Sequence, residues 1–157
     1  MKFYKVSLEN YQKFRENNAE IEYQNIFLPR RSTTYAAGYD FFAPFDILIK
    51  KGETKIIPTG IKCELDPDKV LLLFVRSSLG IKKHLSLANG TGVIDADYFN
   101  NESNEGHILA AITNNGDEDI IIEKGQHFIQ GVIIKYFITE DDETSTLRTG
   151  GIGSTNK

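Results

Sequence analysis

Two short segments of the chain carry the residue types that could perform chemistry. The segment 89–98 reads Asn-Gly-Thr-Gly-Val-Ile-Asp-Ala-Asp-Tyr and places two carboxylates, Asp95 and Asp97, two positions apart. If this segment is a strand, both carboxylates point to the same face. Two carboxylates on one face need compensation by a cation, which is either Mg²⁺ or an arginine, and Arg76 is the obvious arginine. The alternative interpretation is a solvated turn with a surface ion pair.

The second segment is Arg76-Ser77-Ser78-Leu79-Gly80, which follows directly on an apolar run that ends at Val75. A strand end with a guanidinium, two hydroxyls and free backbone N–H groups offers positive charge and directional donors together, which suits phosphate oxygens. A local turn in which the serine hydroxyls bond the nearby backbone explains the same residues. The Gly-rich stretch 148–157 is a third candidate, either as backbone that approaches a ligand or a neighbouring subunit, or as an unstructured terminus.

Short strands are the elements that must position these residues. Apolar runs rich in Ile, Val, Leu, Phe and Tyr are separated by Gly, Pro, Asn and Asp, which predicts an all-β barrel or sandwich. The run 70–75 is unbroken and indicates a strand buried on both faces, whereas 61–65 alternates with period two. The remaining runs are 46–49, 108–112, 120–122 and 128–138. Helix is scarce, and the one candidate is a surface helix over 7–17 with Ser7 as its N-cap.

Composition limits the partners of the chain. Its 157 residues suffice for one domain, and 18 Lys and Arg against 22 Asp and Glu give a net charge of −4. We therefore expect no binding to duplex nucleic acid, and any bound anion must be held by a local site. The single cysteine, Cys63, excludes an internal disulfide and favours a reducing compartment. No apolar run approaches the roughly 20 residues that a bilayer requires, so we expect no membrane association and a cytoplasmic location.

Five segments, taken in order, resemble the five motifs of the trimeric dUTP diphosphatase (dUTPase) family. They are Ala36-Ala37-Gly38-Tyr39-Asp40, Arg76-Ser77-Ser78-Leu79-Gly80, and the stretches 92–98, 124–130 and 148–155. The resemblance covers about residues 26–156 and implies a distorted jelly-roll-like β-barrel with little helix. Under it, residues 26–147 form the barrel and residues 148–157 form a Gly-rich arm that closes over the site. Residues 1–25 are an N-terminal segment of the same domain.

The resemblance implies hydrolysis of dUTP to dUMP and pyrophosphate, which limits uracil incorporation into DNA and supplies dUMP. Asp95 is then the catalytic carboxylate that orients and deprotonates the attacking water. Asp40 and Asp97 have structural roles. Asp97 forms an ion pair with Arg76, and Asp40 can also contact the metal through a water molecule. Mg²⁺ is the implied cofactor, held mainly by the triphosphate and waters and by no direct protein ligand.

The substrate-binding residues implied by the resemblance fall into groups by the part of the nucleotide that they contact. Asn89 and the backbone of Gly92 and Val93 meet the uracil edge, and Tyr98 lies against the deoxyribose and excludes a 2′-hydroxyl. The remaining residues contact the phosphates or belong to the closing arm. They are Arg76, Ser77, Ser78, Gln130, Arg148, Gly151, Ile152 and Gly153. The implied assembly is a homotrimer with active sites at the subunit interfaces, where the arm reaches in from another subunit.

The chain departs from the usual family pattern at four places. Ile152 replaces the usual Phe, His127 stands where Arg is common, Arg148 is one residue nearer the Gly pair, and the loop 99–107 is longer. Two alternatives stay open. A dCTP deaminase-like enzyme shares the fold but needs a glutamate base, which the matching hairpin lacks. A non-catalytic β trimer would bind nucleotide or protein. Release of pyrophosphate, of ammonia or of neither separates the three.

Overall fold

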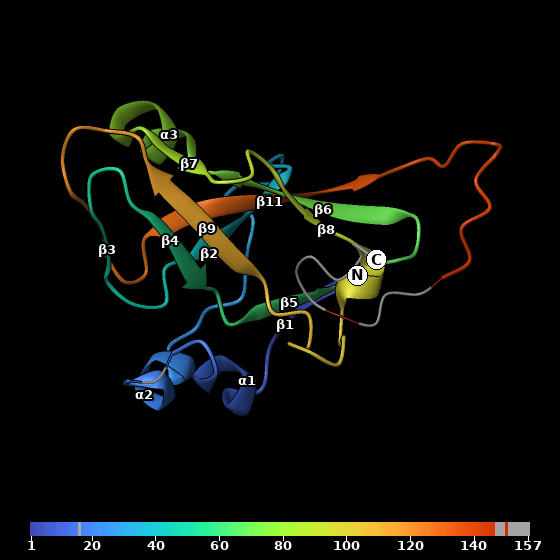
Figure 1. Ribbon diagram of the computed structural model, residues 1–157, viewed down its shortest axis with the longest axis horizontal. Helices are drawn as coiled ribbons and strands as arrows, with labels where there is room; N and C mark the ends of the chain where they lie inside the picture. Colours follow the sequence, from blue (N-terminus) through green and yellow to red (C-terminus); the bar gives the residue numbers. More distant parts are fainter. Residues whose placement is uncertain (16, 147–149, 151–157) are drawn as a thin grey trace.

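Short strands make up most of the structured chain in the computed structural model, which describes residues 1–15, 17–146 and 150 (Figure 1). In chain order the strands are β1 (Lys2–Lys5), β2 (Gly38–Phe42), β3 (Ile47–Ile49), β4 (Thr54–Pro58), β5 (Ile61–Glu64), β6 (Lys69–Val75), β7 (Leu85–Leu87), β8 (Gly92–Ile94), β9 (Leu109–Asn114), β10 (Ile120–Ile122) and β11 (His127–Lys135). The helices are α1 (Leu8–Gln12), α2 (Ala19–Gln24) and α3 (Ser77–Lys83), with one 3-10 turn, η1 (Ala96–Tyr98). The predicted all-β architecture with little helix is confirmed.

The strands pair antiparallel into four small sheets. The largest has the order β2-β11-β6-β8, a second has the order β4-β9-β7, and β1-β5 and β3-β10 form two-stranded pairs. In the largest sheet Gln130 of β11 lies opposite Asp40 of β2 on one side and Phe74 of β6 on the other. This register brings segments that are far apart in sequence into one row, and the strand order leaves β8 at the edge of the sheet.

Each predicted apolar run overlaps a strand, and their inward side chains form the core. Ile47, Ile57, Ile112 and Phe128 are completely buried. In β6 Leu71 and Leu73 point into the core, whereas Leu72 and Phe74 on the second face are partly exposed. The prediction that β6 is buried on both faces is therefore wrong at Leu72 and Phe74 in a single chain, because the strand forms part of the barrel wall.

The N-terminal segment packs against this same core. Strand β1 pairs with β5, and Phe3 lies in the core opposite Cys63. Helix α1 begins at Ser7 as expected, since the Ser7 hydroxyl accepts the Asn10 N–H at 3.1 Å. The helix is shorter than predicted, and it is not a surface element, because Asn10 and Tyr11 are buried.

Helix α2 was not predicted, and it is held to α1 and the barrel by side chains. The Arg15 guanidinium bonds the Glu22 carboxylate at 2.8 Å and lies 3.8 Å from the centre of the Phe45 ring. None of the helices in the described residues is long and apolar enough to cross a membrane.

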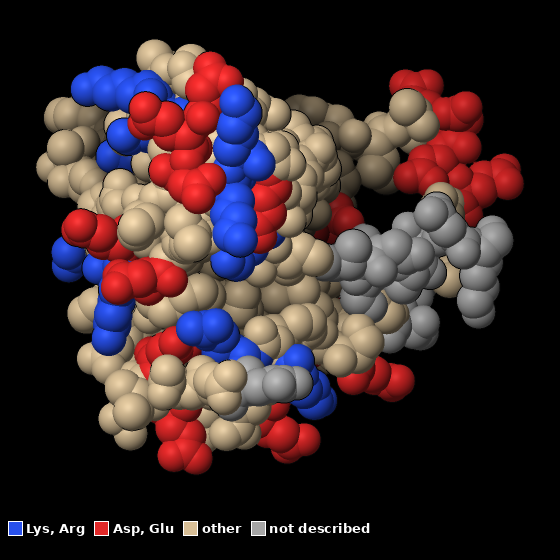
Figure 2. Space-filling view, turned by 60° about the vertical axis from the view of Figure 1, so that its left-hand side comes forward, with Lys and Arg blue, Asp and Glu red and all other residues tan. Residues whose placement is uncertain are grey.

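The surface charge is mixed. Figure 2 shows Lys and Arg interspersed with Asp and Glu on the side of the molecule that carries β3, β4 and α3. In the loop after β3, Lys51 forms an ion pair with Asp117 at 3.1 Å. Interspersed charges of both signs give no extended basic stripe on this face, as expected for a chain with a net charge of −4.

Candidate active site

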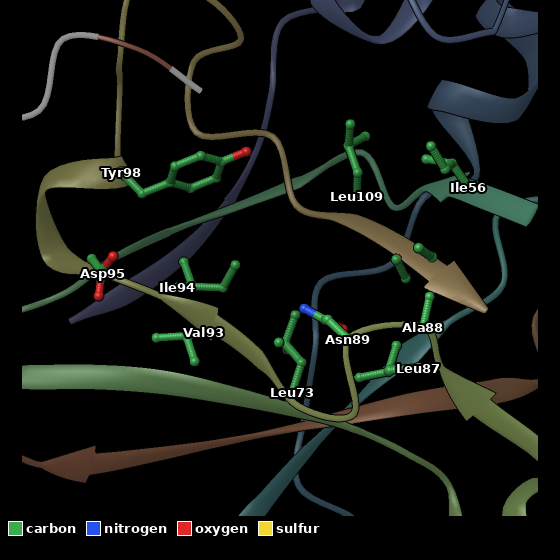
Figure 3. A pocket seen from close by; sticks show the side chains of 13 residues that line it. Ile56, Leu73, Leu87, Ala88, Asn89, Val93, Ile94, Asp95, Tyr98 and Leu109 are labelled. Atoms are coloured by element: carbon green, nitrogen blue, oxygen red, sulfur yellow. The ribbon is translucent and has the colours of Figure 1, made fainter. Parts of the chain in front are cut away.

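A cavity of about 430 Å³ lies where the edge strand β8 faces the β4-β9-β7 sheet. Small-molecule sites commonly have volumes of about 300–1,000 Å³, so the cavity has the size for a nucleoside. Its apolar lining includes Ile56, Leu73, Leu87 and Leu109. The polar side chains among the lining residues are Asn89, Asp95 and Tyr98, which all come from the segment 89–98 (Figure 3).

The local chain path explains how strand β8 presents its backbone. A turn closed by the Gly90 N–H on the Leu87 carbonyl at 2.9 Å leads into β8, and Gly90 has φ +73°, which favours glycine. Gly92 then lies against Leu73 of β6, so closely that an added Cβ would stand 3.0 Å from the Leu73 Cβ. Among the described strands β8 pairs with β6 alone, so its other edge offers backbone donors and acceptors in fixed order.

Asp95 lies at the end of this strand, half-exposed and at the cavity wall. The strand ends at Ile94, and η1 begins one residue after Asp95, closed by the Tyr98 N–H on the Asp95 carbonyl at 3.2 Å. The prediction that Asp95 and Asp97 share a strand face is therefore wrong. Asp97 is exposed on the 3-10 turn and does not line this cavity.

Tyr98 places its ring along the cavity, on the side opposite Asn89 (Figure 3). The side chain is buried, and its hydroxyl donates to the His107 carbonyl at 2.9 Å and accepts from the Asn104 amide at 2.7 Å. The ring is thus held from behind by polar groups while its face contributes to the wall.

A second cluster gathers the other predicted residues, with the buried Asp40 at its centre. The Arg76 guanidinium forms an ion pair with Asp40, whose side chain is 3% exposed. The Ser32 hydroxyl donates to the same carboxylate, and Nδ1 of the His127 ring lies 3.3 Å from it. The predicted partner of Arg76 was Asp97, and the structure corrects this to Asp40. The reason is topological, because β11 lies between β2 and β6 and brings Asp40 beside the end of β6.

Ser77 and Ser78 are the first residues of α3, not part of a simple turn, and both are exposed. The first backbone N–H groups of a helix have no acceptor within the helix, so they are available to an external anion. Gln130 belongs to the same region, since its side-chain oxygen lies 2.8 Å from the position that a Cβ on Gly38 would occupy. Glycine at position 38 makes room for this amide.

The predicted site residues therefore fall into two places in one chain. Asn89, Gly92, Val93, Asp95 and Tyr98 surround the cavity, whereas Arg76, Ser77, Ser78 and Gln130 do not line it. The predicted residues of the C-terminal arm, Arg148, Gly151, Ile152 and Gly153, lie outside the described residues. Within residues 1–15, 17–146 and 150, no group of three His, Cys, Asp or Glu side chains could hold a metal ion.

Sequence reasoning missed the polar group behind Tyr98. Asn101, Asn104 and His107 are buried, and burial lowers the pKa of His107 to about 4, outweighing the attraction of the Glu105 carboxylate. Their sequence is that of a polar surface loop. The signal in the sequence is the residue types Asn100 and Gly106, because Asn and Gly tolerate positive φ, and both residues adopt it where the loop folds back on itself.

The fold and the site together define a β-barrel with a nucleoside-sized cavity, one carboxylate at its wall and a separate arginine cluster. The dUTPase family model matches residues 24–156, so the chain belongs to the dUTPase family. Deoxyuridine 5′-triphosphate nucleotidohydrolase of Lactococcus lactis is 43% identical over 147 residues, which cover 91% of this chain and 98% of that protein. The corresponding protein of Rickettsia felis is 39% identical over 135 residues, covering 82% and 87%.

The solved structures agree with the family assignment. The crystal structure of dUTPase from Streptococcus mutans superimposes with a TM-score of 0.73 at 36% identity, covering 89% of this chain and 99% of that one. The sequence-based identification of the family is confirmed, and these matches favour the hydrolase over the deaminase alternative.

Proposed function

We propose that this chain hydrolyses dUTP to dUMP and pyrophosphate, with Asp95 as the catalytic carboxylate. The observation that carries the proposal is the position of Asp95 at the wall of a nucleoside-sized cavity that also holds Asn89, the edge of β8 and Tyr98. Relatives that match over most of the chain are deoxyuridine 5′-triphosphate nucleotidohydrolases, which supports the same reaction here.

The cavity suits recognition of uracil. The backbone of Gly92 and Val93 presents its donors and acceptors in an order that side-chain rotation cannot change, and the Asn89 amide adds one of each. Cytosine presents the opposite pattern at the same edge, so it would leave buried polar groups unpaired at a cost of about 1–3 kcal/mol each. The Tyr98 ring lies against the deoxyribose and leaves no room for a 2′-hydroxyl.

The proposed reaction is an in-line displacement at the α-phosphorus. Asp95 accepts a proton from a water molecule, whose oxygen forms the new bond to the α-phosphorus as the bond to the bridging α–β oxygen breaks and pyrophosphate leaves with the electron pair. The half-exposure of Asp95 gives water access to the carboxylate. A positioned base is the contribution that phosphoryl transfer requires of a side chain.

Mg²⁺ fits this site as an ion held mainly by the triphosphate and by water. Magnesium commonly keeps several waters and binds substrate phosphates, so the ion would need no direct bond to Asp95, the half-exposed carboxylate that lies at the cavity wall. The ion would neutralise charge on the phosphates. Asp40 is less suited to contact it through water, because Arg76, His127 and Ser32 enclose its carboxylate. A mutant dUTPase of phage phi11, which shares this fold at 24% identity and a TM-score of 0.65, coordinates a structural Mg(II) ion.

The site residues lie in two separate places of one chain, and this separation supports a homotrimer with active sites at the subunit interfaces. The Arg76 cluster suits phosphates but does not line the cavity of its own chain, so a second copy would supply it. The uncovered face of the barrel wall is apolar: Val93 is 57% exposed and lines a groove with Val70 and Leu72. We assign residues 148–157 to an arm that closes the site from another subunit, with Arg148 on the phosphates and Ile152 over the base.

Removal of dUTP would limit uracil incorporation into DNA, and the product dUMP would supply thymidylate synthesis. A cytoplasmic location remains a prediction that rests on the single cysteine, Cys63, which is buried.

The test compares Asp95→Asn with Asp117→Asn, the same chemical change at an exposed carboxylate in the turn between β9 and β10. With Mg²⁺ and dUTP, pyrophosphate release should fall at least about 100-fold in Asp95→Asn while dUTP binding survives, because the shape is kept and the base is lost. Asp117→Asn should retain wild-type turnover. Equal turnover of the wild type and Asp95→Asn would remove Asp95 from the mechanism.

A further inference from the structure

The loop 99–107 folds back tightly on the end of η1. Asn100 and Glu105 have φ of 56° and 58°, and the Asn100 N–H donates to the Glu105 carbonyl at 3.1 Å. At Gly106, with φ +79°, an added Cβ would lie 2.6 Å from the Tyr98 carbonyl oxygen. The loop is therefore packed directly on the backbone of the tyrosine that lines the cavity.

Two buried asparagines of this loop bond the two ends of Tyr98. The Asn101 amide donates to the Tyr98 carbonyl at 2.8 Å, and the Asn104 amide donates to the Tyr98 hydroxyl at 2.7 Å. The side-chain oxygen of Asn104 in turn accepts from the Asn101 amide at 2.7 Å and from the Gly106 N–H at 3.1 Å. These bonds fix the orientation of the Asn104 amide, so its donor points at the phenol.

The hydrogen bonds that hold Tyr98 continue through His107 to helix α1. The His107 carbonyl accepts from the Tyr98 hydroxyl at 2.9 Å, and the His107 ring nitrogen Nε2 accepts the Gly60 N–H at 2.9 Å. The other ring nitrogen therefore carries the proton of the neutral ring and donates to the Asn10 side chain of α1 at 3.1 Å. Ser7 at the start of α1 bonds Glu105 of the loop as well. Ser7 and Asn10 at the start of α1 and the loop 99–107 thus form one support behind Tyr98.

We propose that Asn104 is a positioning residue that sets sugar selectivity by holding the Tyr98 ring in place. This proposal rests on the proposed dUTP hydrolysis. A steric wall rejects a 2′-hydroxyl only if it does not yield, and a ring tethered at its hydroxyl has lost the freedom to tilt away from the sugar. Asn104 itself is 6% exposed and does not line the cavity, so it acts through Tyr98 and not on the nucleotide.

The experiment measures kcat/KM for dUTP and for UTP in the wild type, Asn104→Ala, Tyr98→Phe and the double variant. The ratio of the dUTP value to the UTP value should fall about tenfold in Asn104→Ala, the equivalent of the hydrogen bond between Asn104 and the Tyr98 hydroxyl, chiefly through faster UTP turnover. Tyr98→Phe removes the same bond together with the bond to the His107 carbonyl, so the ratio should fall at least as far. The double variant should fall no more than about twofold below Tyr98→Phe, because that change has already removed the bond between the phenol and Asn104.

Asn114→Ala is the matched control for loss of stability. Asn114 is also buried, and its amide holds a different loop by bonds to the carbonyls of Ile49 and Glu118 at 3.1 and 2.8 Å. This variant should be destabilised yet keep the wild-type ratio. An unchanged ratio in Asn104→Ala, an equal loss of both activities, or additive effects with Tyr98→Phe would overturn the proposal.

A second readout needs no turnover. In protein labelled with 3-fluorotyrosine, the ¹⁹F signal that disappears in Tyr98→Phe belongs to Tyr98, and Asn104→Ala should shift or broaden it. An unchanged signal would overturn the positioning role. Failure of the wild type to hydrolyse dUTP would refute the proposed function alone, since this signal still reports on the tether.

Discussion

Acid should destabilise the protein through one buried histidine. His107 is completely buried, and the loss of water around its ring lowers its pKa from 6.5 to about 4. Its ring accepts the Gly60 N–H and donates to Asn10, so both nitrogens are used in the neutral form. Protonation would replace the acceptor of the Gly60 N–H with a second donor and place an extra charge in the core.

The size of the effect follows from the difference in proton binding. Between pH 6.5 and 4 the unfolded chain binds a proton at His107 that the folded chain does not, so stability falls as the pH is lowered through this window. Each pH unit costs about 1.4 kcal/mol, and the loss from pH 7 to pH 5 amounts to about 2 kcal/mol.

Urea unfolding of the wild type and of His107→Gln at pH 7 and pH 5 measures this cost. The distal amide of Gln can still accept the Gly60 N–H but does not titrate, and a fixed protein concentration keeps any subunit association comparable. Carboxylates titrate in both proteins, so the difference isolates the histidine. The wild type should lose about 2 kcal/mol more than His107→Gln. Parallel losses would refute the reasoning.

Two further predictions concern the Arg76 cluster. Gly38→Ala should displace the Gln130 amide, because the new Cβ would lie 2.8 Å from its oxygen, and should raise KM for dUTP by about two- to tenfold, as expected for one neutral hydrogen bond. The same change added to Gln130→Ala should have little effect, and an unchanged KM in the single variant would show that the amide is not used. Co-refolding Asp95→Asn with Arg76→Ala chains should restore about a quarter of wild-type activity if each site combines two chains at random. A mixture no more active than its parents, with trimers verified by sedimentation, would place both residues in the same chain's site.

The strands that could be predicted are those in which neighbouring residues form a continuous or alternating apolar pattern. The runs 61–65, 70–75 and 120–122 became β5, β6 and β10, because continuous or alternating apolar residues have few other ways to be buried. Strands β1, β2, β4 and β7 and helices α2 and α3 were not predicted, and β4 and α3 show why. Strand β4 carries Lys and Pro, and α3 is too short for helical periodicity to appear, so pairing with β9 and burial of Leu79 determine them instead.

The part of the site that could be predicted is the part that lies within a single sequence motif. The segment 89–98 surrounds the cavity as expected, but the partner of Arg76 depended on the neighbouring strands, and sequence proximity pointed to Asp97 instead of Asp40. Nor does the composition of the polar loop 99–107 reveal that its asparagines are buried against Tyr98. Such contacts arise only when a loop folds back, so the only indication in the sequence was the presence of Asn100 and Gly106, residue types that tolerate the positive φ they adopt.

Pyrophosphate release by the purified protein with Mg²⁺ and, separately, dUTP, dCTP, dTTP and UTP tests the proposed hydrolysis of dUTP. The arrangement of Asn89, the β8 edge and Tyr98 predicts release from dUTP, with dCTP and UTP at least about tenfold slower, since cytosine leaves polar groups unpaired and the 2′-hydroxyl of UTP meets the Tyr98 ring. Equal release from all four nucleotides would contradict the assignment of the cavity. Release from none of them would contradict the proposed hydrolysis and favour the non-catalytic β trimer.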